Sequence, residues 1–202
     1  MSQSMNVKDY VWVYEKLFTP ELCNEILQTT EKLSWKTHVW QTVYGSMSIK
    51  DTKRRDYKES TKIHEEHELE VCGLDPQISA KMMPFLVKAT SQYTYRFNPP
   101  INGTITQLAN QFTSIRVNRY KEGAMMRKHI DHSYDKEHPI LTMIGALNDE
   151  VEYEGGQFIV FDDYEVKLKK GDVVIFPSNF MYPHEVKLVT KGVRYSFAAW
   201  AS

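Results

Sequence analysis

The second half of the chain consists of short β-rich segments, which leaves few choices of fold. From Gln111 onward, stretches of β-branched and aromatic residues are separated by glycine and aspartate. They lie at Ser114–Tyr120, Ile140–Leu147, Gln157–Phe161, Glu165–Leu168, Asp172–Phe176 and Val193–Trp200. Short strands at such even spacing are typical of a β-sandwich or β-barrel. We therefore expect a mainly β core in residues 101–202.

The first half of the chain is expected to be richer in helix. Tyr10–Phe18 has the β-branched and aromatic composition of a strand. Thr19-Pro20 then provides an N-cap followed by proline at the first helical position, and a helical apolar stripe runs to about Leu33. Ile78–Ala89 also has a helical pattern, which Pro84 is expected to kink or split.

Length and composition favour one domain over residues 1–202, with a helix-rich part in residues 1–100 packed on a β part in residues 101–202. Hydrophobic residues make up 42% of the chain, which is enough for a sizeable core. The net charge of −1 argues against strong nonspecific nucleic-acid binding. The sequence has no apolar run long enough for a membrane span and no visible signal peptide, and its two cysteines form no disulfide framework. These features predict a cytoplasmic protein.

Two histidines and an aspartate form the principal candidate site. In His129-Ile-Asp131 the two polar residues are at positions i and i+2, so on a strand they project to the same side. His184 follows Pro183 in a later segment and can supply a third ligand. Two imidazoles and one carboxylate, with open coordination positions, are the ligands of non-haem Fe(II) oxygenases. Arg194 adds a planar cation suited to a dicarboxylate.

The other histidines are weaker candidates. His64-Glu-Glu-His67 places two imidazoles at i and i+3, but the neighbouring glutamates indicate a solvated surface. His38 lies among aromatic residues and is expected to be an ordinary, partly buried histidine. A lone His-x-Asp pair is itself common in sequences, so the metal interpretation depends on the surrounding pattern.

That pattern resembles the prolyl 4-hydroxylase-like branch of the Fe(II)/2-oxoglutarate-dependent dioxygenases over roughly residues 111–200. The resemblance rests on several features in the family's order. They are Tyr120-x-x-Gly123-x-x-Met126-x-x-His129-x-Asp131, Leu141–Asn148 followed by Tyr153-Glu-Gly-Gly-Gln-Phe158, Lys169–Pro177, and His184 followed by Gly192-x-Arg194 and Trp200. The LFTPELCNEIL segment near the N-terminus is also similar, though less specifically.

The resemblance implies a double-stranded β-helix, or jelly roll, with N-terminal helices packed against it. His129, Asp131 and His184 would bind Fe(II), and Arg194 would bind the distal carboxylate of 2-oxoglutarate. Tyr120, Ser196 or Thr142 would add a hydrogen bond to this cosubstrate. The sequence departs from the family where many relatives have a tyrosine at the position of Met126. The alternative for Tyr120 and Ser196 is packing in the barrel wall, and for Arg194 it is a structural ion pair.

The implied reaction is hydroxylation of a prolyl residue in a protein or peptide, with Fe(II), 2-oxoglutarate and O₂, and with ascorbate as a stimulant. Candidate residues around the substrate are Arg127, Phe180, Tyr182 and Trp200. The charged segment Ser46–Glu59 is either a solvated loop or a lid that orders over a bound peptide. The oligomeric state is not predicted.

Three rival functions stay open. One is oxidation of a small molecule by the same chemistry. Another is demethylation of nucleic acid, although relatives of that kind carry a second arginine where this chain has Trp200. The third is a catalytically silent jelly-roll binding module, which would have no need for all four of His129, Asp131, His184 and Arg194.

Overall fold

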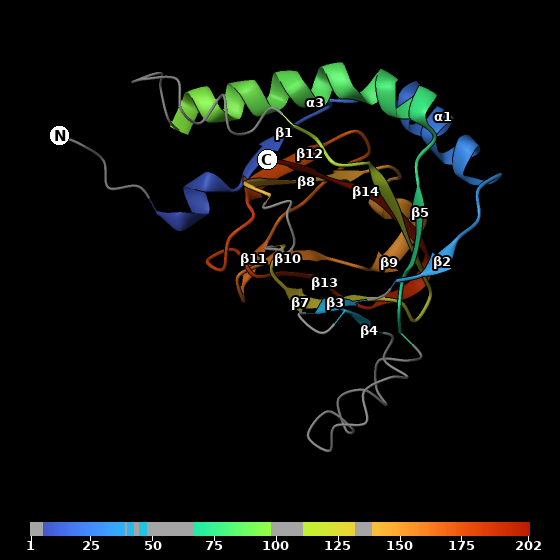
Figure 1. The fold of residues 1–202 in the computed structure, drawn as a ribbon. Coiled ribbons are helices and arrows are strands. Elements are labelled where there is room, and N and C mark those ends of the chain that lie inside the picture. The colour runs from blue at the N-terminus through green and yellow to red at the C-terminus, as the bar shows by residue number, and fades with distance from the viewer. Residues whose placement is uncertain (1–5, 39, 43–44, 48–66, 98–110, 132–138) are drawn as a thin grey trace.

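The fold of the chain is known from a computed structural model, which describes residues 6–38, 40–42, 45–47, 67–97, 111–131 and 139–202. Two antiparallel sheets face each other and enclose an interior, and helices lie outside the larger sheet (Figure 1). The segment expected to form a lid, Ser46–Glu59, lies almost entirely outside the described residues.

The larger sheet has eight strands and includes strands from both halves of the chain. Its order is β1 (Trp12–Tyr14), β12 (Val173–Pro177), β8 (Leu141–Ala146), β14 (Val189–Ala201), β6 (Arg116–Lys121), β5 (Glu70–Gly73) and β2 (Lys36–Thr37), with β9 (Tyr153–Gly155) paired to β14. The long strand β14 is central because it pairs with β6, β8 and β9.

The smaller sheet has four strands. Its order is β11 (Tyr164–Glu165), β10 (Phe158–Val160), β13 (His184–Val186) and β7 (Met126–His129). All of its pairs are antiparallel. A separate hairpin joins β3 (Trp40–Thr42) to β4 (Gly45–Met47). Most of the β-rich segments expected from the sequence thus become strands. The exception is Glu165–Leu168, because β11 ends at Glu165 and residues 166–168 are not in a strand. Two opposed antiparallel sheets are the arrangement of a jelly roll.

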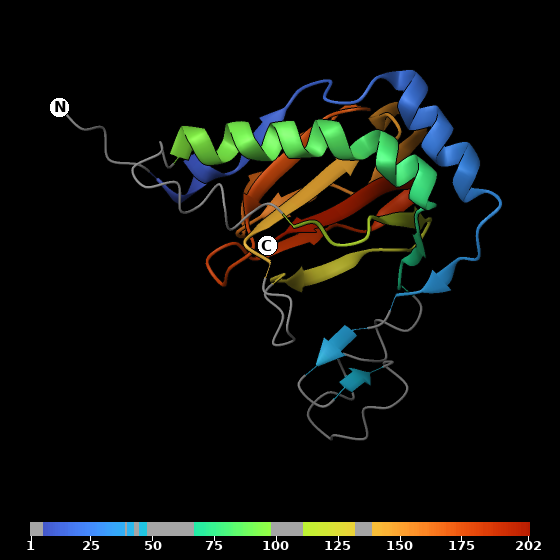
Figure 2. The ribbon, with the colours of Figure 1, turned by 45° about the horizontal axis from the view of Figure 1, so that its top comes forward.

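Two α-helices cover the outer face of the larger sheet (Figure 2). Helix α1 is Pro20–Thr30, and its N-cap Thr19 accepts a hydrogen bond from the Leu22 backbone N–H, as the sequence predicts. Helix α3 is Pro76–Phe97 and lies along the sheet. Short 3₁₀ segments, η1 (Val7–Tyr10) and η4 (Glu150–Glu152), complete the described elements.

Of the two outcomes expected at Pro84, a kink or a split of the second helix, the split is wrong. Helix α3 continues for 22 residues with Pro84 inside it. Proline removes one backbone donor and crowds the preceding turn. Here the buried side chains Met82 and Leu86, on either side of Pro84, both pack against the sheet. This tertiary packing offsets the local cost of the proline.

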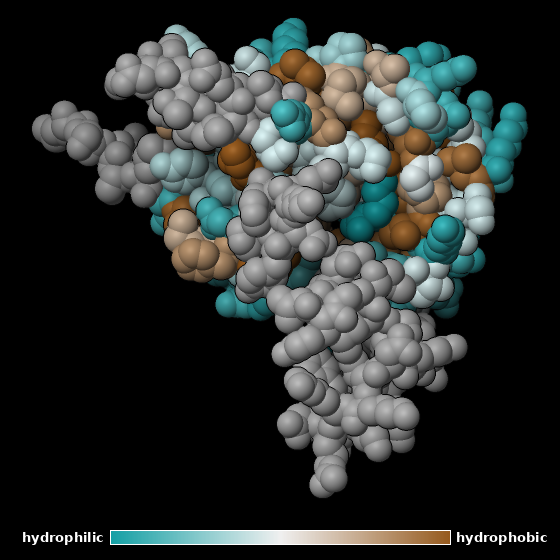
Figure 3. Space-filling model, viewed as in Figure 1, coloured by the Kyte–Doolittle hydropathy of each residue, from teal (hydrophilic) through white to brown (hydrophobic). Residues whose placement is uncertain are grey.

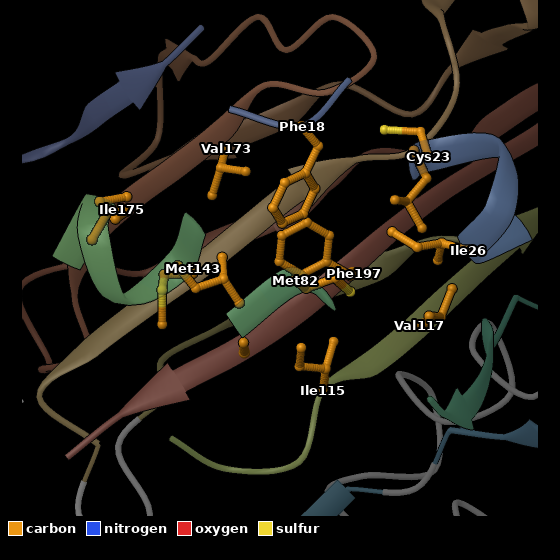
Figure 4. Close-up of a cluster of buried hydrophobic side chains, with 14 of the residues drawn as sticks. Phe18, Cys23, Ile26, Met82, Ile115, Val117, Met143, Val173, Ile175 and Phe197 are labelled. Atoms are coloured by element: carbon orange, nitrogen blue, oxygen red, sulfur yellow. The ribbon is translucent and has the colours of Figure 1, made fainter. Parts of the chain in front are cut away.

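The hydrophobic core has two parts, one on each face of the larger sheet. The outer part joins α1 and α3 to the sheet and includes Phe18, Met82, Met143 and Phe197 (Figure 4). The inner part lies between the two sheets and includes Phe158 and other residues that alternate with those of the outer part along each strand. The face shown in Figure 3 mixes hydrophilic and hydrophobic residues.

Two smaller expectations also concern the described residues. Cys23 and Cys72 are buried and free, so no disulfide joins them. Among the helices that the structure describes, none is both long and apolar enough to cross a membrane.

Candidate metal centre

Two histidines lie side by side on neighbouring strands of the smaller sheet. His129 is the last residue of β7 and His184 is the first of β13, and the antiparallel register pairs them directly. Asp131 lies two residues beyond His129, past the end of the strand. The expectation that His129 and Asp131 project from one strand is therefore wrong for Asp131, because the strand ends at His129. The structure nevertheless brings all three side chains to one point.

The three side chains offer ligand atoms at close range. The Nε2 atom of His129 is 3.4 Å from one carboxylate oxygen of Asp131, and the Nε2 atom of His184 is 3.6 Å from the other. The two imidazole ring centroids are 4.3 Å apart. All candidate ligand atoms lie within 4.8 Å of one another, and this is the one such cluster of three or more in the described residues.

Backbone carbonyls orient both imidazoles. The Nδ1 atom of His129 is 2.7 Å from the Arg127 carbonyl oxygen, and that of His184 is 3.1 Å from the Tyr182 carbonyl oxygen. A carbonyl oxygen only accepts, so each Nδ1 must carry the proton and donate it. Each Nε2 then presents a lone pair toward Asp131. This is the arrangement that metal-binding histidines normally have.

The electrostatics of the cluster also suit a cation. Burial lowers the pKa of His184 to about 4, so its imidazole is neutral near pH 7. Burial alone would raise the pKa of Asp131. The imidazoles of His184 and His129 and a hydrogen bond from the Trp200 side chain outweigh burial and hold this pKa below its ordinary range. Two imidazoles and one carboxylate match the donor set of a non-haem Fe(II) site.

A second row of side chains holds Asp131. The Thr142 hydroxyl donates to Oδ2 of Asp131 at 2.8 Å, and Thr142 and Ser178 hydroxyls are 2.7 Å apart. Thr142 is fully buried on β8, where its register partner on β14 is Trp200. The sequence suggested Thr142 as a cosubstrate contact, and the structure places its hydroxyl on the Asp131 carboxylate. Trp200, expected near the substrate, also bonds to Asp131.

Arg194 lies inside the barrel without a carboxylate partner. Its side chain is buried on β14, and its Nη1 donates to the Ser196 hydroxyl at 3.2 Å. Its guanidinium carbon is 5.2 Å from the centroid of the Tyr120 ring, on the paired strand β6. None of the ion pairs within the described ranges includes Arg194, so the structural ion pair considered as an alternative finds no support there. Burial raises the pKa of Tyr120, which keeps its hydroxyl protonated as a donor.

The Gly155-Gly156 turn shapes the space beside Arg194. Gly156 has φ +66°, and a Cβ atom placed on it would lie 3.0 Å from Cδ of Arg194. A pocket of about 200 Å³ opens here, lined among others by Gly156, Phe158, Leu168 and Arg194. The second glycine of the pair noted in the sequence therefore has a physical reason, because a side chain at Gly156 would press on Arg194.

The remaining candidates lie further from the cluster or have other partners. Arg127 is 3.9 Å from Glu68, and Tyr182 is buried with its hydroxyl 3.3 Å from the Val7 carbonyl oxygen. Phe180 is 77% exposed. His38 is buried near Glu68, and His67 bonds to the Gly123 carbonyl. His64 lies outside the described residues.

Sequence reasoning missed two polar residues of the barrel interior, Arg116 and Asn118. Both precede Tyr120 on β6 at intervals of two residues, so all three project to the same face. The signal was available, because Tyr120 was already a candidate for the interior. An arginine and an asparagine in a strand are ordinarily interpreted as surface residues, and for that reason neither was predicted to lie in the interior.

Comparison with known proteins gives a consistent result for the C-terminal half. Residues 115–202 match the family model of the 2OG-Fe(II) oxygenase superfamily. A PKHD-type hydroxylase of Xylella fastidiosa (strain M23) is 35% identical over 99 residues, which cover 42% of this chain and 42% of the relative. A PKHD-type hydroxylase of Acinetobacter baumannii is 36% identical over 93 residues, covering 41% and 40%. The matches thus span about two fifths of these relatives.

Solved structures resemble nearly the whole chain. A Trichoplax adhaerens prolyl hydroxylase, solved in complex with a hypoxia inducible factor peptide fragment, has a TM-score of 0.64 at 16% identity and covers 95% of this chain and 83% of its own. A viral collagen prolyl hydroxylase from Paramecium Bursaria Chlorella virus-1 has a TM-score of 0.60 at 15% identity, covering 100% and 95%.

These findings confirm the predicted jelly-roll fold with helices packed against it. In sequence, residues 115–202 are similar to the 2OG-Fe(II) oxygenase superfamily and to PKHD-type hydroxylases. In fold, the chain is similar to prolyl hydroxylases.

Proposed function

We propose that this protein is an Fe(II)- and 2-oxoglutarate-dependent dioxygenase that hydroxylates a substrate C–H bond, with a prolyl residue of a protein or peptide as the favoured target. The observation that carries this proposal is the convergence of His129, Asp131 and His184, with both imidazoles anchored through Nδ1. The family match to residues 115–202 supports the same chemistry. Fe(II), 2-oxoglutarate and O₂ are the expected cofactor and cosubstrates, with ascorbate as a stimulant.

His129, Asp131 and His184 would hold Fe(II), and such a set of three protein ligands would leave coordination positions for cosubstrate and oxygen. When bound, Fe(II) and 2-oxoglutarate would supply the oxidising chemistry, in which O₂ places one oxygen atom in the substrate and one in succinate while CO₂ leaves. Thr142 and Trp200 fix the Asp131 carboxylate through hydrogen bonds. Such outer partners keep ligands oriented and typically affect metal affinity 10- to 100-fold.

Arg194 provides the anchor for the distal carboxylate of 2-oxoglutarate. A guanidinium binds a carboxylate through two parallel hydrogen bonds, and burial strengthens that contact. Ser196, 3.2 Å from the Arg194 Nη1, and the protonated Tyr120 are placed to add hydrogen bonds. The surrounding apolar residues of the inner core, such as Phe158 and Phe176, exclude water from the reacting centre.

Several wider assignments belong to the same proposal. We infer a single domain over residues 1–202, because strands β1, β2 and β5 of the first half pair into the larger sheet. A cytoplasmic location and the absence of strong nucleic-acid binding follow from the composition and a net charge of −1. The similar Trichoplax prolyl hydroxylase was solved in complex with a peptide fragment, which supports a peptide or protein as the partner.

The first test compares succinate formation from 2-oxoglutarate in air and without oxygen, for wild type and His129→Ala. We expect iron- and oxygen-dependent succinate in the wild type and its loss in the variant. Lys187→Ala, an exposed change close to His184 on the chain, is the matched control and should behave as wild type. Calorimetric titration of Mn(II) and 2-oxoglutarate follows binding separately. A wild type that binds neither would contradict the proposal.

A further inference from the structure

The interior face of β6 carries a second arginine near the metal centre. Arg116, Asn118 and Tyr120 alternate along β6 with Val117, which belongs to the outer core. The register pairs Tyr120 with Arg194, Asn118 with Ser196 and Arg116 with Ala198. Arg116 therefore lies toward the end of the barrel where β14 carries Trp200, and Arg194 lies toward the other end.

Trp200 links Arg116 to the metal centre. The guanidinium carbon of Arg116 is 5.1 Å from the centroid of the Trp200 ring, which places a cation over an aromatic face. The side chain of Trp200 bonds to Asp131. The negative charge of Asp131 also acts electrostatically on Arg116. Arg116 is thus a neighbour of the proposed metal ligands without being one of them.

The guanidinium of Arg116 is partly buried and only partly hydrogen-bonded by the described residues. Its Nε atom is buried and meets no acceptor in the described part of the chain, and none of the ion pairs found there includes Arg116. Nearby arginines differ, because Arg119 is 2.7 Å from Glu70 and Arg127 is 3.9 Å from Glu68. Buried charges are costly unless they are paired and hydrogen-bonded. An anion beside Arg116 would therefore supply the acceptor that its Nε atom lacks.

The charges of the loaded site point the same way. Fe(II), the Asp131 carboxylate, a 2-oxoglutarate dianion and the Arg194 guanidinium together have no net charge. Arg116 adds one positive charge to this enclosed centre. Since the cosubstrate carboxylates would be matched by Arg194 and the metal, an anion that arrives with the substrate would balance the charge of Arg116.

A second unpartnered atom lies on the same row. The Oδ1 atom of Asn118 is buried and has no hydrogen-bond partner among the described residues. An acceptor left unsatisfied in a barrel interior is costly, and an N–H or O–H of a ligand would satisfy it. The row therefore offers one cation and one acceptor, which suits a polar ligand better than an apolar one.

We propose that Arg116 is a specificity-determining residue that binds a carboxylate of the substrate, close to the carbon that is oxidised. This inference rests on the proposed function and narrows it to acid-bearing substrates. The carboxylate has two possible sources, which share this chemistry. It is either the terminal carboxylate of a small acid or an acidic side chain beside the target residue of a polypeptide.

The experiment measures probe binding by calorimetry to protein loaded with Mn(II) and 2-oxoglutarate, without oxygen. One arm compares N-acetyl-L-proline with N-acetyl-L-prolinamide. The other compares a peptide that has aspartate beside proline with the same peptide that has asparagine. We expect the acid form to bind about 10- to 100-fold more tightly than the neutral form in one arm, and that arm identifies the source.

Two variants at one position separate charge from packing. Arg116→Met keeps a long side chain over Trp200 and should abolish the preference for the acid form, whereas Arg116→Lys should retain most of it. Arg119→Met, on the opposite face of β6, is the matched control and should leave the preference unchanged. Thermal unfolding of each variant verifies that it is folded. If Arg116→Met does not fold, Arg116→Lys still gives a decisive test.

Several results would overturn the inference. They are equal binding of acid and neutral forms in both arms, binding of neither form, or a preference that survives Arg116→Met. An affinity for 2-oxoglutarate that falls as far in Arg116→Met as in Arg194→Met would assign Arg116 to the cosubstrate instead. Failure of the wild type to bind Mn(II) and 2-oxoglutarate would reject the proposed function, and the same probes titrated into unloaded protein would still test Arg116.

Discussion

Gly156 has a backbone conformation that side chains disfavour, directly beside Arg194. Its φ is +66°, and an added Cβ would lie 3.0 Å from both Cδ of Arg194 and Cγ2 of Val189. We expect Gly156→Ala to lower the free energy of unfolding by about 1–2 kcal/mol through the left-handed backbone alone. Displacement of Arg194 should also weaken 2-oxoglutarate binding by about tenfold.

Denaturant unfolding and calorimetry measure these two effects. Gly73→Ala is the matched control, because a Cβ at Gly73 would meet nothing within 4 Å. Its unfolding free energy should change by less than about 0.5 kcal/mol, and its cosubstrate affinity should be that of wild type. If Gly156→Ala behaved in the same way as the control, the contact between the glycine turn and Arg194 would contribute neither to stability nor to 2-oxoglutarate binding.

His184 makes the metal-free protein sensitive to acid. Burial lowers its pKa from 6.5 to about 4, so between these values the unfolded chain binds a proton that the folded chain does not. The unfolding free energy therefore falls as the pH falls from about 6.5 to about 4, by up to about 3 kcal/mol. The stabilisation is fully present above pH 6.5.

A pH series of denaturant unfolding curves on metal-free protein measures this loss. Burial also lowers the pKa of His38, which adds a loss of the same sign. The contribution of His184 is therefore obtained as the difference between wild type and His184→Gln, which has no titrating group at this position. Identical pH profiles for the two proteins would show that His184 does not titrate as its burial implies.

At the scale of single elements, local signals in the sequence predicted well and long-range ones did not. The start of α1 was predictable because Thr19 and Pro20 act on the first turn itself. The pair His129 and Asp131 was visible because it lies in one short segment. The bond from Thr142 to Asp131 was not, because only the pairing of distant strands brings the two side chains together.

The short strands of the smaller sheet explain a second limit on what the sequence could predict. Strand β13 has three residues, His184–Val186, and such a length carries no periodic pattern. Its place beside β7 is set by the enclosure of the inner core and not by its own sequence. The facing of His129 and His184 could therefore be expected from the family resemblance, but not from strand propensity.

Helix α3 offers a test of how packing overrides propensity. Pro84 is on the exposed side of the helix and costs a backbone hydrogen bond in its interior. We expect Pro84→Ala to raise the free energy of unfolding by about 1–2 kcal/mol. This is less than the intrinsic difference of about 3 kcal/mol between the two residues, because proline also restricts the unfolded chain.

Chemical denaturation measures the change, and Lys88→Ala, at another exposed position of α3, is the control for a general effect of alanine. That control should change stability by less than about 0.5 kcal/mol. Loss of stability in Pro84→Ala would mean that the proline is required for the path of the helix over the sheet.

At the scale of the whole molecule, the larger sheet is covered on both faces by parts of the same chain. The outer core joins α1 and α3 to strands β6, β8, β12 and β14, and the inner core joins the same strands to the smaller sheet. The carbonyl of Tyr10, in η1, accepts a hydrogen bond at 2.6 Å from Tyr93, in α3. Since each layer supplies one wall of a core, we expect helices and barrel to unfold together.

Leu86→Ala tests this expectation. Leu86 is fully buried in α3 against the sheet, so its truncation should lower the free energy of unfolding by about 2–5 kcal/mol. Far-ultraviolet circular dichroism is dominated by the helices. Tryptophan fluorescence reports on four residues outside the helices, which are Trp12 in β1, Trp35, Trp40 in β3 and Trp200 in β14. The two transitions should stay coincident and shift by the same amount, as in a single cooperative unit. Val87→Ala, the adjacent and 46% exposed position, should shift neither. Separate transitions, with only the helical signal moved by Leu86→Ala, would show instead that the helices and the barrel are independent units.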